Sequence, residues 1–499
     1  MCLIEQIKKP YYFYRRKQLT ATVKYLKNSE RITMKSYLNK TIFQLFIAIF
    51  LPVTANLVAA EAPYLGMGAK SGEVSANAAA IHIRLTESVG QQRNHGIPGK
   101  LGKARIQYSL SEQITPSLFS EWRSSDSEND YYLQYQLTDL IPNSRYYYRA
   151  ELVDSVTKTK RLSEVFSFKT APHSALREDI HFQVTTCQSS QGLPTYDVMR
   201  RENPDFLVSA GDTVYYDKFD VRSKEEAYWL YQKDYGTPYT INYFAQTSSY
   251  FMKDDHDYRY NDADPLSNRA VNTIRIEGPN GIDSDPNRSD NTWLTHEEGI
   301  DIFKQAFPHS DLPYRTFRWG KGVQIWLLEG RDYRSKNKMP DGPNKTIWGE
   351  KQKAWLKETL LASDADFRII ISPSPLIGPD KLHKTDNHAN KNGFMVEGRT
   401  FMDWMIDKNI GDNTFFVCGD RHWQYHSIYK DKVHEFCSGP TSQFKVQHLP
   451  KPEKGIIKQP YNGPSGGFLA VKYKVDKSIS FEHFGERGKI QNKKTFTRK

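Results

Sequence analysis

The chain has 499 residues, of which 38% are hydrophobic and 25% are charged, and its formal net charge is +11. This composition excludes an intrinsically disordered or collagen-like chain, and the length predicts roughly two to three domains. A basic chain first suggests a nucleic acid or an anionic membrane as partner. However, residues 1–60 hold ten Lys or Arg against two acidic residues, and so carry eight of the eleven net charges. Beyond them no basic stripe is interleaved with aromatic residues, so we expect no specific nucleic-acid recognition.

Residues 1–60 are predicted to be an export signal. The stretch Thr41–Ala60 is largely apolar, follows basic residues and ends in small ones, as secretory signals do. Its unbroken apolar part, Leu45–Leu51, is far shorter than the about 20 residues that a membrane span needs. We therefore expect cleavage near its end and a periplasmic or secreted protein with no stable membrane span. An uncleaved N-terminal anchor is the alternative, and Met34 is the start we expect because the segment before it is long for a signal.

Cysteine usage points to one thiol with a separate role. The chain has Cys2, Cys187, Cys418 and Cys437, so removal of the signal leaves an odd number. Cys418 and Cys437 lie in apolar, strand-like runs and could form a disulfide or remain two buried thiols. Cys187 is the cysteine that needs another explanation.

Residues 62–172 predict a small antiparallel β-sandwich. Short alternating runs such as ARIQYSL and YYYRAEL are separated by polar turns, and no helix-period segment interrupts them. The stretch Leu137–Leu152, closed by FSFKTAP, resembles the strand-turn-strand close of fibronectin type III-like domains. A linker is expected at Ala171–Asp179.

Residues 178–485 predict an α/β domain, because apolar β-runs alternate with helical patterns from Ile180 onward. The expected helices lie at residues 195–202, 224–235, after Thr295 through Phe307, 350–361 and 399–408. Asp262–Asp290 is rich in Asn, Asp and Pro and predicts a long surface excursion. The Lys-rich residues 486–499 predict a basic, solvated tail.

Reactive side chains follow several of the predicted strands. Ligands of open α/β sheets bind beyond the carboxyl ends of the strands, so these positions are the ones that matter. The side chains found there are Cys187, Asp212, Tyr215, Asp217, Arg331, Asp420, Arg421 and His422. The segment Asp254–Asn261 adds carboxylates, an imidazole and an amide. Each feature alone also fits a turn, a surface histidine or a solvated loop, but their convergence indicates a functional site.

The residue types indicate two unlike metal ions. A thiolate and a phenolate suit iron, whereas Asp and Asn oxygens suit Ca²⁺, Mg²⁺ or Mn²⁺. Two such ions sharing Asp212 could hold a hydroxide in line with a phosphorus and offset the charge on the attacking and leaving oxygens. The site therefore predicts a phosphoester hydrolase.

Four ordered motifs make this prediction more specific. TCQS (186–189), GDTVYYD (211–217), DDHDYRYND (254–262) and GDRHWQYHS (419–427) resemble the successive motifs of PhoD-type alkaline phosphatases, which lie within the metallophosphoesterases. The resemblance extends over residues 180–484, and a leading fibronectin-like domain is typical of the family. It implies a two-sheet α/β/β/α sandwich preceded by a small all-β sandwich of the fibronectin or immunoglobulin kind.

The resemblance also implies roles for individual residues. By motif position, a ferric iron would be held by Cys187, Asp212, Tyr215 and His422. A calcium would share Asp212 and be held also by Asn261 and Asp420. Mg²⁺, Mn²⁺ or Zn²⁺ could substitute for these ions. The superfamily more widely opens with Asp-x-His, whereas this chain has Cys187 and Gln188, which makes a di-zinc or di-manganese centre less expected.

Three residues are candidates for direct action on the phosphate ester. His256 lies where metallophosphoesterases place the histidine that assists the leaving oxygen, and an imidazole suits such general acid work near neutral pH. Arg331 and Arg421 are candidates for binding phosphate oxygens, because a guanidinium offers two parallel donors. A structural salt bridge explains Arg421 equally well.

Further polar residues could orient the ligands or contact substrate. They are Asp217, Asp254, Asp255 and the DNHAN residues Asp386, Asn387 and His388. A plain polar loop is the alternative for the last three. Family members usually carry Trp before the DDH and an LDTR-like strand end, where this chain has Lys253 and Glu329-Gly330-Arg331.

The sequence thus predicts an exported, metal-dependent phosphoesterase that acts on a small phosphorylated substrate and releases an alcohol. Two alternatives stay open. One is a phosphodiesterase or phospholipase D-like activity at the same site. The other is a catalytically inactive secreted protein whose sandwich binds a glycan or surface partner. The sequence predicts no particular protein partner.

Overall fold

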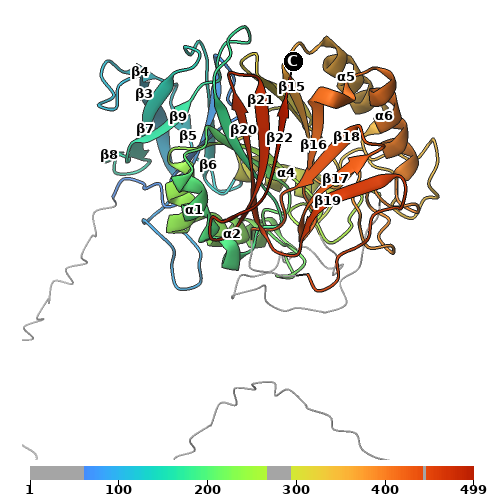
Figure 1. Ribbon diagram of the computed structural model, residues 1–499. Helices are drawn as coiled ribbons and strands as arrows, with labels where there is room; N and C mark the ends of the chain where they lie inside the picture. The colour runs from blue at the N-terminus through green and yellow to red at the C-terminus, as the bar shows by residue number, and fades with distance from the viewer. Residues whose placement is uncertain (1–60, 267–293, 442–445, 499) are drawn as a thin grey trace, which may run out of the picture. The chain divides into compact units, whose positions relative to one another are not determined.

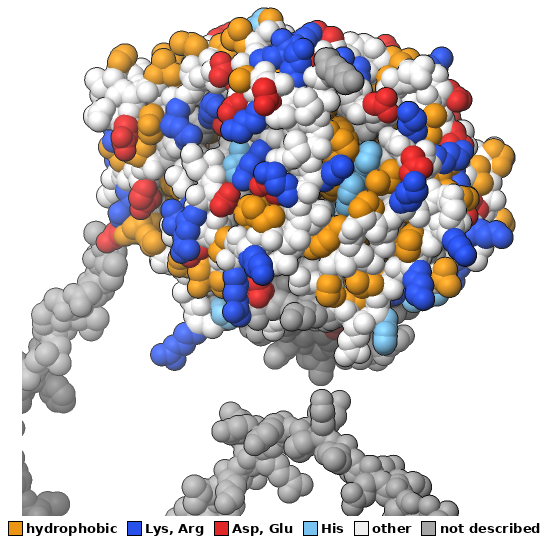
Figure 2. All heavy atoms as spheres, in the orientation of Figure 1, with side chains coloured by type: hydrophobic (Ala, Val, Ile, Leu, Met, Phe, Trp, Pro, Cys, Tyr) orange, Lys and Arg blue, Asp and Glu red, His pale blue; other side chains and the backbone are white. Residues whose placement is uncertain are grey.

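The computed structural model describes residues 61–266, 294–441 and 446–498. The predicted signal and most of the predicted excursion after Asp262 lie outside these ranges. None of the helices in the three ranges combines the length and the apolar character that crossing a membrane requires. On the face drawn in Figure 2, Lys and Arg side chains lie singly or in small groups among acidic, apolar and uncharged ones.

Two large sheets dominate the described chain (Figure 1). The first has nine strands in the order β22-β21-β20-β10-β11-β12-β1-β2-β6. Its strands are β1 (Ala69–Gly72), β2 (Ala79–Arg84), β6 (Tyr132–Leu137), β10 (Ile180–Thr185), β11 (Phe206–Ala210), β12 (Ser248–Met252), β20 (Gly467–Lys474), β21 (Ser478–Gly485) and β22 (Ile490–Thr497). Within it β10, β11 and β12 are parallel, so their carboxyl ends meet at one edge.

The second sheet has seven strands in the order β13-β14-β15-β16-β18-β17-β19. Its strands are β13 (Arg315–Trp319), β14 (Val323–Leu327), β15 (Phe367–Ser372), β16 (Thr414–Cys418), β17 (Gln424–Tyr429), β18 (Val433–Cys437) and β19 (Ile457–Gly463). Here β14, β15, β16 and β18 are parallel. Cys418 and Cys437 face each other across β16 and β18, and both are buried free thiols.

Alternating apolar residues bury both faces of each sheet. In β11, Phe206 and Val208 pack into the core between the sheets while Leu207 packs under helices; in β16, Phe415 and Phe416 divide in the same way. The helices are α1 (Thr195–Arg201), α2 (Lys224–Tyr235), α3 (Pro238–Phe244), α4 (His296–Ala306), α5 (Gly349–Ala362) and α6 (Met395–Asp407). The first four cover the nine-stranded sheet and the last two the seven-stranded sheet (Figure 1). The structure confirms the predicted α/β/β/α sandwich.

The predicted helices after residues 195, 224, 295 and 350 are present with ends within a few residues of the expected ones. The capping box that predicted α4 forms as expected, since the Thr295 hydroxyl accepts from the Glu298 amide and the Glu298 carboxylate accepts from the Thr295 amide. The last helix, α6, begins four residues before the expected Arg399. The short helix α3 is an addition, with the Thr237 side chain as its N-cap and Pro238 at its first turn.

The N-terminal region is strand-rich and consistent with a β-sandwich. A third sheet contains β3 (Gly102–Ser109), β4 (Leu118–Phe119), β5 (Arg123–Ser124), β7 (Arg145–Asp154), β8 (Lys160–Leu162) and β9 (Phe166–Lys169). Inward residues such as Ile106 and Tyr148 share one core with Ile81 and Tyr135 of β2 and β6. The second layer of this sandwich is thus an extension of the nine-stranded sheet.

A short parallel junction between β1 and β12 makes that extension. Gly72 pairs with Ser249, and a side-chain Cβ at Gly72 would lie only 2.5 Å from the Ser249 carbonyl oxygen. The Ser249 hydroxyl donates to the Ser71 carbonyl at 3.0 Å, and the Tyr250 hydroxyl donates to the Val74 carbonyl at 2.5 Å. The N-terminal region is therefore hydrogen-bonded into the sheet of the α/β domain, an arrangement that chain order alone did not indicate.

The C-terminus differs from the tail expected at residues 486–499, because β22 pairs with β21 at the edge of the nine-stranded sheet. Phe496 packs against the main core, and Lys493 forms an ion pair with Glu482 at 2.7 Å. Lysines on an edge strand discourage pairing with other chains. The lysines that predicted a solvated tail therefore belong to an edge strand, where they discourage pairing with other chains.

Candidate metal centre

Three predicted ligands stand immediately beyond parallel strands. Cys187 follows β10, Asp212 follows β11 and Asp420 follows β16, so both sheets contribute. Their backbone φ angles are +49°, +57° and +61° respectively, in the left-handed region that residues other than glycine rarely adopt. Such strained conformations are kept where surrounding contacts enforce them, and they are common at functional sites.

Close contact between the two sheets holds these loops together. A Cβ at Gly419 would lie 2.3 Å from the Ala210 carbonyl oxygen and 2.6 Å from that of Pro373. The Thr186 hydroxyl donates to the Gly211 carbonyl at 3.2 Å and accepts from the Asp420 amide at 3.1 Å. Gly419 and Thr186 therefore bring Asp420 of one sheet beside Asp212 of the other.

The side chains of the expected iron site converge. The Cys187 Sγ and the Tyr215 hydroxyl each lie 3.4 Å from Asp212 Oδ2, and the Tyr215 hydroxyl lies 3.4 Å from His422 Nε2. The potential ligand atoms of Cys187, Asp212 and His422 all lie within 4.8 Å of one another. This is a compact set of sulfur, oxygen and nitrogen donors around one point.

Asp212 also belongs to a second, carboxylate-rich group. Its ligand atom and those of Asp254 and Asp420 lie within 4.8 Å of one another. Asn261 is exposed and lines the same cavity as Asp420 and His256. Asp212 is therefore placed to be shared between two cations, as the sequence predicted for that residue.

The electrostatics of the cluster favour bound cations. Burial raises the pKa of Asp212 well above its ordinary value, and the negative charges of Asp255 and Asp254 add to this effect. Burial and the Asp212 carboxylate likewise raise the pKa of the Cys187 thiol. Asp212 Oδ1 and Asp254 Oδ2 are buried without a hydrogen-bond partner. Because buried anions are costly unless they are paired or coordinate a metal, this donor set fits metal ions.

His256 is held by Asp217. Its Nδ1 lies 2.7 Å from Asp217 Oδ1, and the other Asp217 oxygen accepts from the backbone amide of Asn261 at 3.1 Å. Burial lowers the pKa of His256, but the carboxylates of Asp255, Asp212 and Asp217 outweigh this and raise it to about 10. Since Asp217 occupies Nδ1, Nε2 is the nitrogen left to act on a substrate.

Asp257 positions the loops of the candidate site, a role that was not predicted from the sequence. Its Oδ2 accepts from the Thr213 amide and hydroxyl, both at 2.8 Å, and its Oδ1 accepts from the Asp254 amide at 2.7 Å. Asp257 is fully buried, so these bonds tie the loop after β11 to the loop after β12. The signal was present in DDHD, but the sequence did not show which of its carboxylates faces inward.

The Arg331 guanidinium is buried behind the candidate site and does not line the cavity. It is 0% exposed, its Nε donates to Asp254 Oδ1 at 2.6 Å, and its Nη1 donates to the Ala263 carbonyl at 3.0 Å. Because its guanidinium is committed to a buried carboxylate, Arg331 orients Asp254 and balances the charge of the site from behind. The predicted contact with phosphate oxygens is replaced by this structural role.

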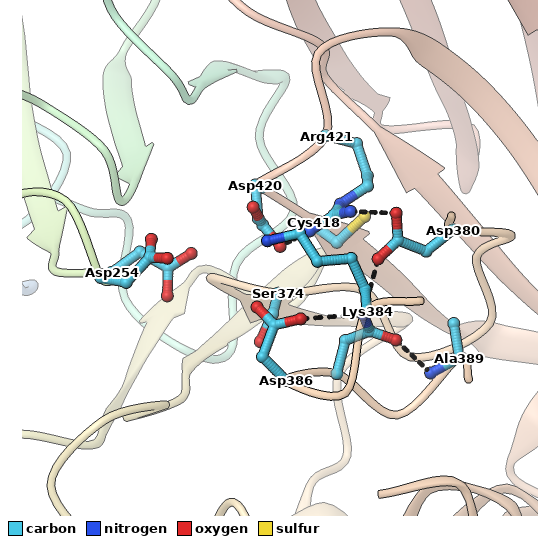
Figure 3. Close-up of polar contacts among 12 residues, drawn as sticks. Asp254, Ser374, Asp380, Lys384, Asp386, Ala389, Cys418, Asp420 and Arg421 are labelled. Atoms are coloured by element: carbon cyan, nitrogen blue, oxygen red, sulfur yellow. Dashed lines mark hydrogen bonds and ion pairs between the residues drawn. The ribbon is translucent and has the colours of Figure 1, made fainter. Parts of the chain in front are cut away.

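Arg421 is buried between two carboxylates, those of Asp420 and Asp380 (Figure 3). It also lines the cavity, and its Nη1 and Nη2 are taken up by Asp380 and Asp420 respectively. The salt bridge that the sequence offered as the alternative role is therefore present. The contact with phosphate oxygens stays a prediction.

The DNHAN residues divide between two roles. Asp386 is fully buried, and its ligand atom lies within 4.8 Å of those of Asp255 and Asp262. The Asn387 amide donates to Asp380 Oδ2 at 2.7 Å and so supports the partner of Arg421. His388 turns away from the site, because its Nε2 lies 2.9 Å from Glu397 Oε2 on α6 and its ring packs on Trp348. The sequence offered His388 either as a residue that contacts substrate or orients ligands, or as part of a plain polar loop, and the structure makes it a packing residue.

The two departures from the family pattern contact each other. The Lys253 ammonium lies 2.6 Å from Glu329 Oε2 and 2.7 Å from Asp332 Oδ1, and both Lys253 and Glu329 are buried. Glu329 Oε1 accepts from the Arg331 amide at 2.6 Å. Glu329, just after β14, therefore fixes the backbone of Arg331 and neutralises the charge of Lys253.

Two cavities flank the metal-ligand cluster and share His422. One, of about 530 Å³, is lined by His256, Asn261, Lys381, Lys384, Asp420, Arg421, Trp423 and His448, among others. The other, of about 540 Å³, is lined by residues that include Cys187, Gln188, Tyr215, Phe219 and Pro440. The candidate ligands are thus reachable from outside on both sides.

Comparisons with known proteins agree with this geometry. The family model of PhoD-like phosphatases matches residues 182–461. A solved structure of PhoD is similar, with 17% sequence identity, a TM-score of 0.67, and coverage of 88% of this chain and 91% of that one. The purple acid phosphatase PPD1 from yellow lupin (Lupinus luteus) seeds is also similar, with 11% identity, a TM-score of 0.58, and coverage of 88% and 75%.

At such identities the two solved structures show the fold alone, and no curated protein sequence matches this chain. The family model, however, covers more than half of the chain and contains all four motifs that carried the resemblance. The predicted relationship is confirmed: the chain belongs to the PhoD-like phosphatase family.

Proposed function

We propose that this protein is an exported, metal-dependent phosphoesterase that hydrolyses small phosphorylated alcohols. The observation that carries the proposal is the meeting of a thiol, a phenol, an imidazole and several carboxylates around Asp212, at the facing ends of two sheets. Such a site binds cations, and the phosphatase family supplies the reaction class.

Cys187, Asp212, Tyr215 and His422 would hold a ferric iron, because thiolate and phenolate donors suit iron. Asp212, Asn261 and Asp420 would hold a calcium, because all three offer oxygen ligands; Mg²⁺, Mn²⁺ or Zn²⁺ could take these places. When bound, the ions neutralise the phosphate and lower the pKa of water for attack on phosphorus.

The chain's own residues would then orient the ester and move one proton. Asp217 holds the His256 ring through Nδ1, so Nε2 can donate a proton to the leaving oxygen. The Arg421 guanidinium is fixed by Asp380 and Asp420, and so would supply a positive charge at the wall of the cavity that receives the phosphate. Arg331 and Asp257 keep the Asp254 loop in position without touching the substrate.

The test is metal analysis and an ester assay on the mature protein. We expect iron and a second divalent ion in the purified wild type, hydrolysis of a phosphomonoester, a phosphodiester or both, and loss of turnover in Asp212→Asn. Asp197→Asn, on the surface helix α1, is the matched control and should keep full activity. Hydrolysis of neither ester after reconstitution with metals would overturn the proposal.

The same assay distinguishes the alternatives. A strong preference for the diester would support the phosphodiesterase or phospholipase D-like activity, which needs no change of ligands. A secreted, inactive binding protein predicts no turnover in either form and no effect of Asp212→Asn on partner binding. The set of buried donors argues for the enzyme, because a binding scaffold has no need of unpaired buried carboxylate oxygens.

A further inference from the structure

The cavity on the Cys187 side of the cluster has its own recognition chemistry. We call it the Gln188 pocket and define it by Gln188, Ser189, Tyr215, Lys218, Phe219 and Pro440. Its volume of about 540 Å³ equals that of the cavity on the other side of His422. A phosphate group alone needs far less space, so the pocket has room for an organic group.

Gln188 is held so that its amide nitrogen is free to donate. Its backbone amide donates to the Asp212 carbonyl at 2.8 Å, which connects Gln188 to the loop after β11. Its side-chain Oε1 accepts from the Tyr196 hydroxyl at 2.5 Å and from the Tyr235 hydroxyl at 3.5 Å. Gln188 is only 3% exposed, and its Nε2 has no hydrogen-bond partner. A buried donor without a partner is costly, so this arrangement favours a ligand that accepts from it.

Ser189 repeats the pattern at the next position. Its hydroxyl is also buried without a hydrogen-bond partner. By contrast, the Asp234 carboxylate in the same pocket accepts from the Ser190 hydroxyl at 2.9 Å and from the Lys233 ammonium at 3.0 Å. The pocket therefore offers free donors and no free carboxylate, which suits an acceptor-bearing group without positive charge.

The remaining walls combine flat rings with one cation. Phe219 is half-buried and packs edge-on against Trp229, which fixes its ring, and Pro440 is buried. Tyr215 lies against His256, with ring centroids 4.4 Å apart, and the Lys218 ammonium lies 3.3 Å from the centroid of the Tyr215 ring. The Tyr215 ring therefore separates this pocket from His256, which lines the other cavity.

We propose that the Gln188 pocket binds the organic group of the phosphate ester, and that this group is flat and apolar with a hydrogen-bond acceptor near the phosphorus. Gln188 Nε2 donates to the acceptor, and Phe219 packs on the apolar face. This inference rests on the proposed function and adds the substrate class to it.

Binding of two non-hydrolysable ligands tests the proposal without turnover. Phenylphosphonate and methylphosphonate share the anionic head and differ in the ring. We expect the metal-loaded wild type to bind phenylphosphonate at least about tenfold more tightly by calorimetry, as burial of a ring of this size supports. In Phe219→Ala this ratio should fall to about threefold or less, with unchanged metal content. Neither phosphonate carries an acceptor on its organic group, so Gln188→Ala is tested with phenacylphosphonate, whose ketone oxygen can accept from Nε2. The variant should bind phenacylphosphonate about threefold or more weakly than the wild type does.

Three further variants locate the effect. Phe303→Ala removes a partly buried ring on α4 outside both cavities and should leave the ratio unchanged. Tyr196→Phe keeps the packing but removes the bond that orients the Gln188 amide, so it should partially weaken phenacylphosphonate binding even if Gln188→Ala fails to fold. Lys381→Ala alters the other cavity; a collapse of the ratio in this variant, with no change in Phe219→Ala, would place the ring there and overturn the proposal.

Failure of this inference can be separated from failure of the proposed function. A wild type that hydrolyses esters but binds the two phosphonates equally would overturn only the assignment of the pocket. A wild type that prefers phenylphosphonate but hydrolyses no ester would support the pocket and overturn the enzyme.

Discussion

The Thr186 hydroxyl accepts a hydrogen bond from the Asp420 amide at 3.1 Å and donates to the Gly211 carbonyl at 3.2 Å. This one side chain thereby connects the loops that carry Asp212 and Asp420, which belong to different sheets. The relative position of the two carboxylates depends on a residue that binds neither metal nor substrate.

We expect Thr186→Val to weaken the metal centre while the fold persists. Valine has the same shape but leaves the buried Asp420 amide without an acceptor, which costs about 1–3 kcal/mol. Metal content after dialysis and kcat/KM should both fall, the latter about tenfold. Thr186→Ser keeps the hydroxyl and should retain most of both, and equal losses in the two variants would contradict the role of the hydrogen bond.

Gly419→Ala should be strongly destabilising. The added Cβ would lie 2.3 Å from the Ala210 carbonyl oxygen, so the two sheets must separate at the site. We expect a loss of about 3 kcal/mol or more in the free energy of unfolding, measured by urea denaturation, because overpacking against backbone cannot be relieved by a rotamer change. Gly342→Ala, where nothing lies within 4 Å of the new Cβ, is the control and should change stability by less than about 0.5 kcal/mol.

Asp217→Asn should reduce catalysis by loss of proton donation. The variant keeps the shape but no longer fixes His256 as a donor, and general acid catalysis contributes about 10²–10⁴ in rate. The loss in kcat should be largest for alkyl phosphates, whose leaving groups need a proton, and small for p-nitrophenyl phosphate. Asp220→Asn, which alters the nearby ion pair with Arg222, serves as control. An equal loss for both leaving groups would mean that Asp217 only supports the structure.

Arg331→Met should destabilise the protein and not simply weaken phosphate binding. It leaves the buried Asp254 carboxylate without its partner, which costs about 3–5 kcal/mol. Arg177→Met removes a half-exposed partner of Asp366 and should cost no more than about 1 kcal/mol. If Arg331→Met unfolds like the wild type but binds inorganic phosphate more weakly, the phosphate role predicted from sequence is the correct one.

Buried His483 should make stability fall in mild acid. Its Nε2–H donates to the Cys437 carbonyl at 3.0 Å, and its Nδ1 accepts from the Asn492 amide at 3.2 Å, so no lone pair remains for a proton. Burial lowers the pKa of His483 to about 4, although the carbonyl bond opposes this shift. Between about pH 6.5 and 4 the unfolded chain therefore binds a proton that the folded chain does not, and the free energy of unfolding falls as the pH falls.

Urea denaturation between pH 7 and 4.5 measures this effect. His483→Gln should reduce the slope of stability against pH by up to one proton over this range, whereas His173→Gln, on an exposed turn, should leave it unchanged. An unaltered slope in His483→Gln would show that other groups dominate the acid sensitivity.

The sequence placed the candidate ligands well because one rule governs them. Cys187, Asp212 and Asp420 each follow an apolar run, and the carboxyl ends of parallel strands gather at one edge whatever the strand order. The sheet composition and most helices followed in the same way from periodicity and capping residues such as Thr295. Periodicity and capping depend on residues close together in the chain, so the elements that they predict are found in the folded protein.

The direction of individual side chains could not be predicted. Arg331 turns inward to Asp254, and the inward position of Asp257 is set by Thr213; these partners lie 77 and 44 residues away in the chain. His388 turns outward to Glu397, which is nine residues away but lies on a different element, α6. The pairing of β1 with β12 and of β22 with β21 has the same origin. Alternation shows that a segment is a strand but not which strand lies beside it.

Through the β1–β12 pairing, the N-terminal region covers an edge that β12 would otherwise expose in the nine-stranded sheet. Without residues 62–172, β12 would become an edge strand, and its unpaired amides and carbonyls beside Ser249 would be open to pairing with other chains. The loop that bears Asp254 and His256 leaves directly from that strand. An isolated α/β domain of this protein would therefore expose the edge of the strand from which the Asp254 loop leaves.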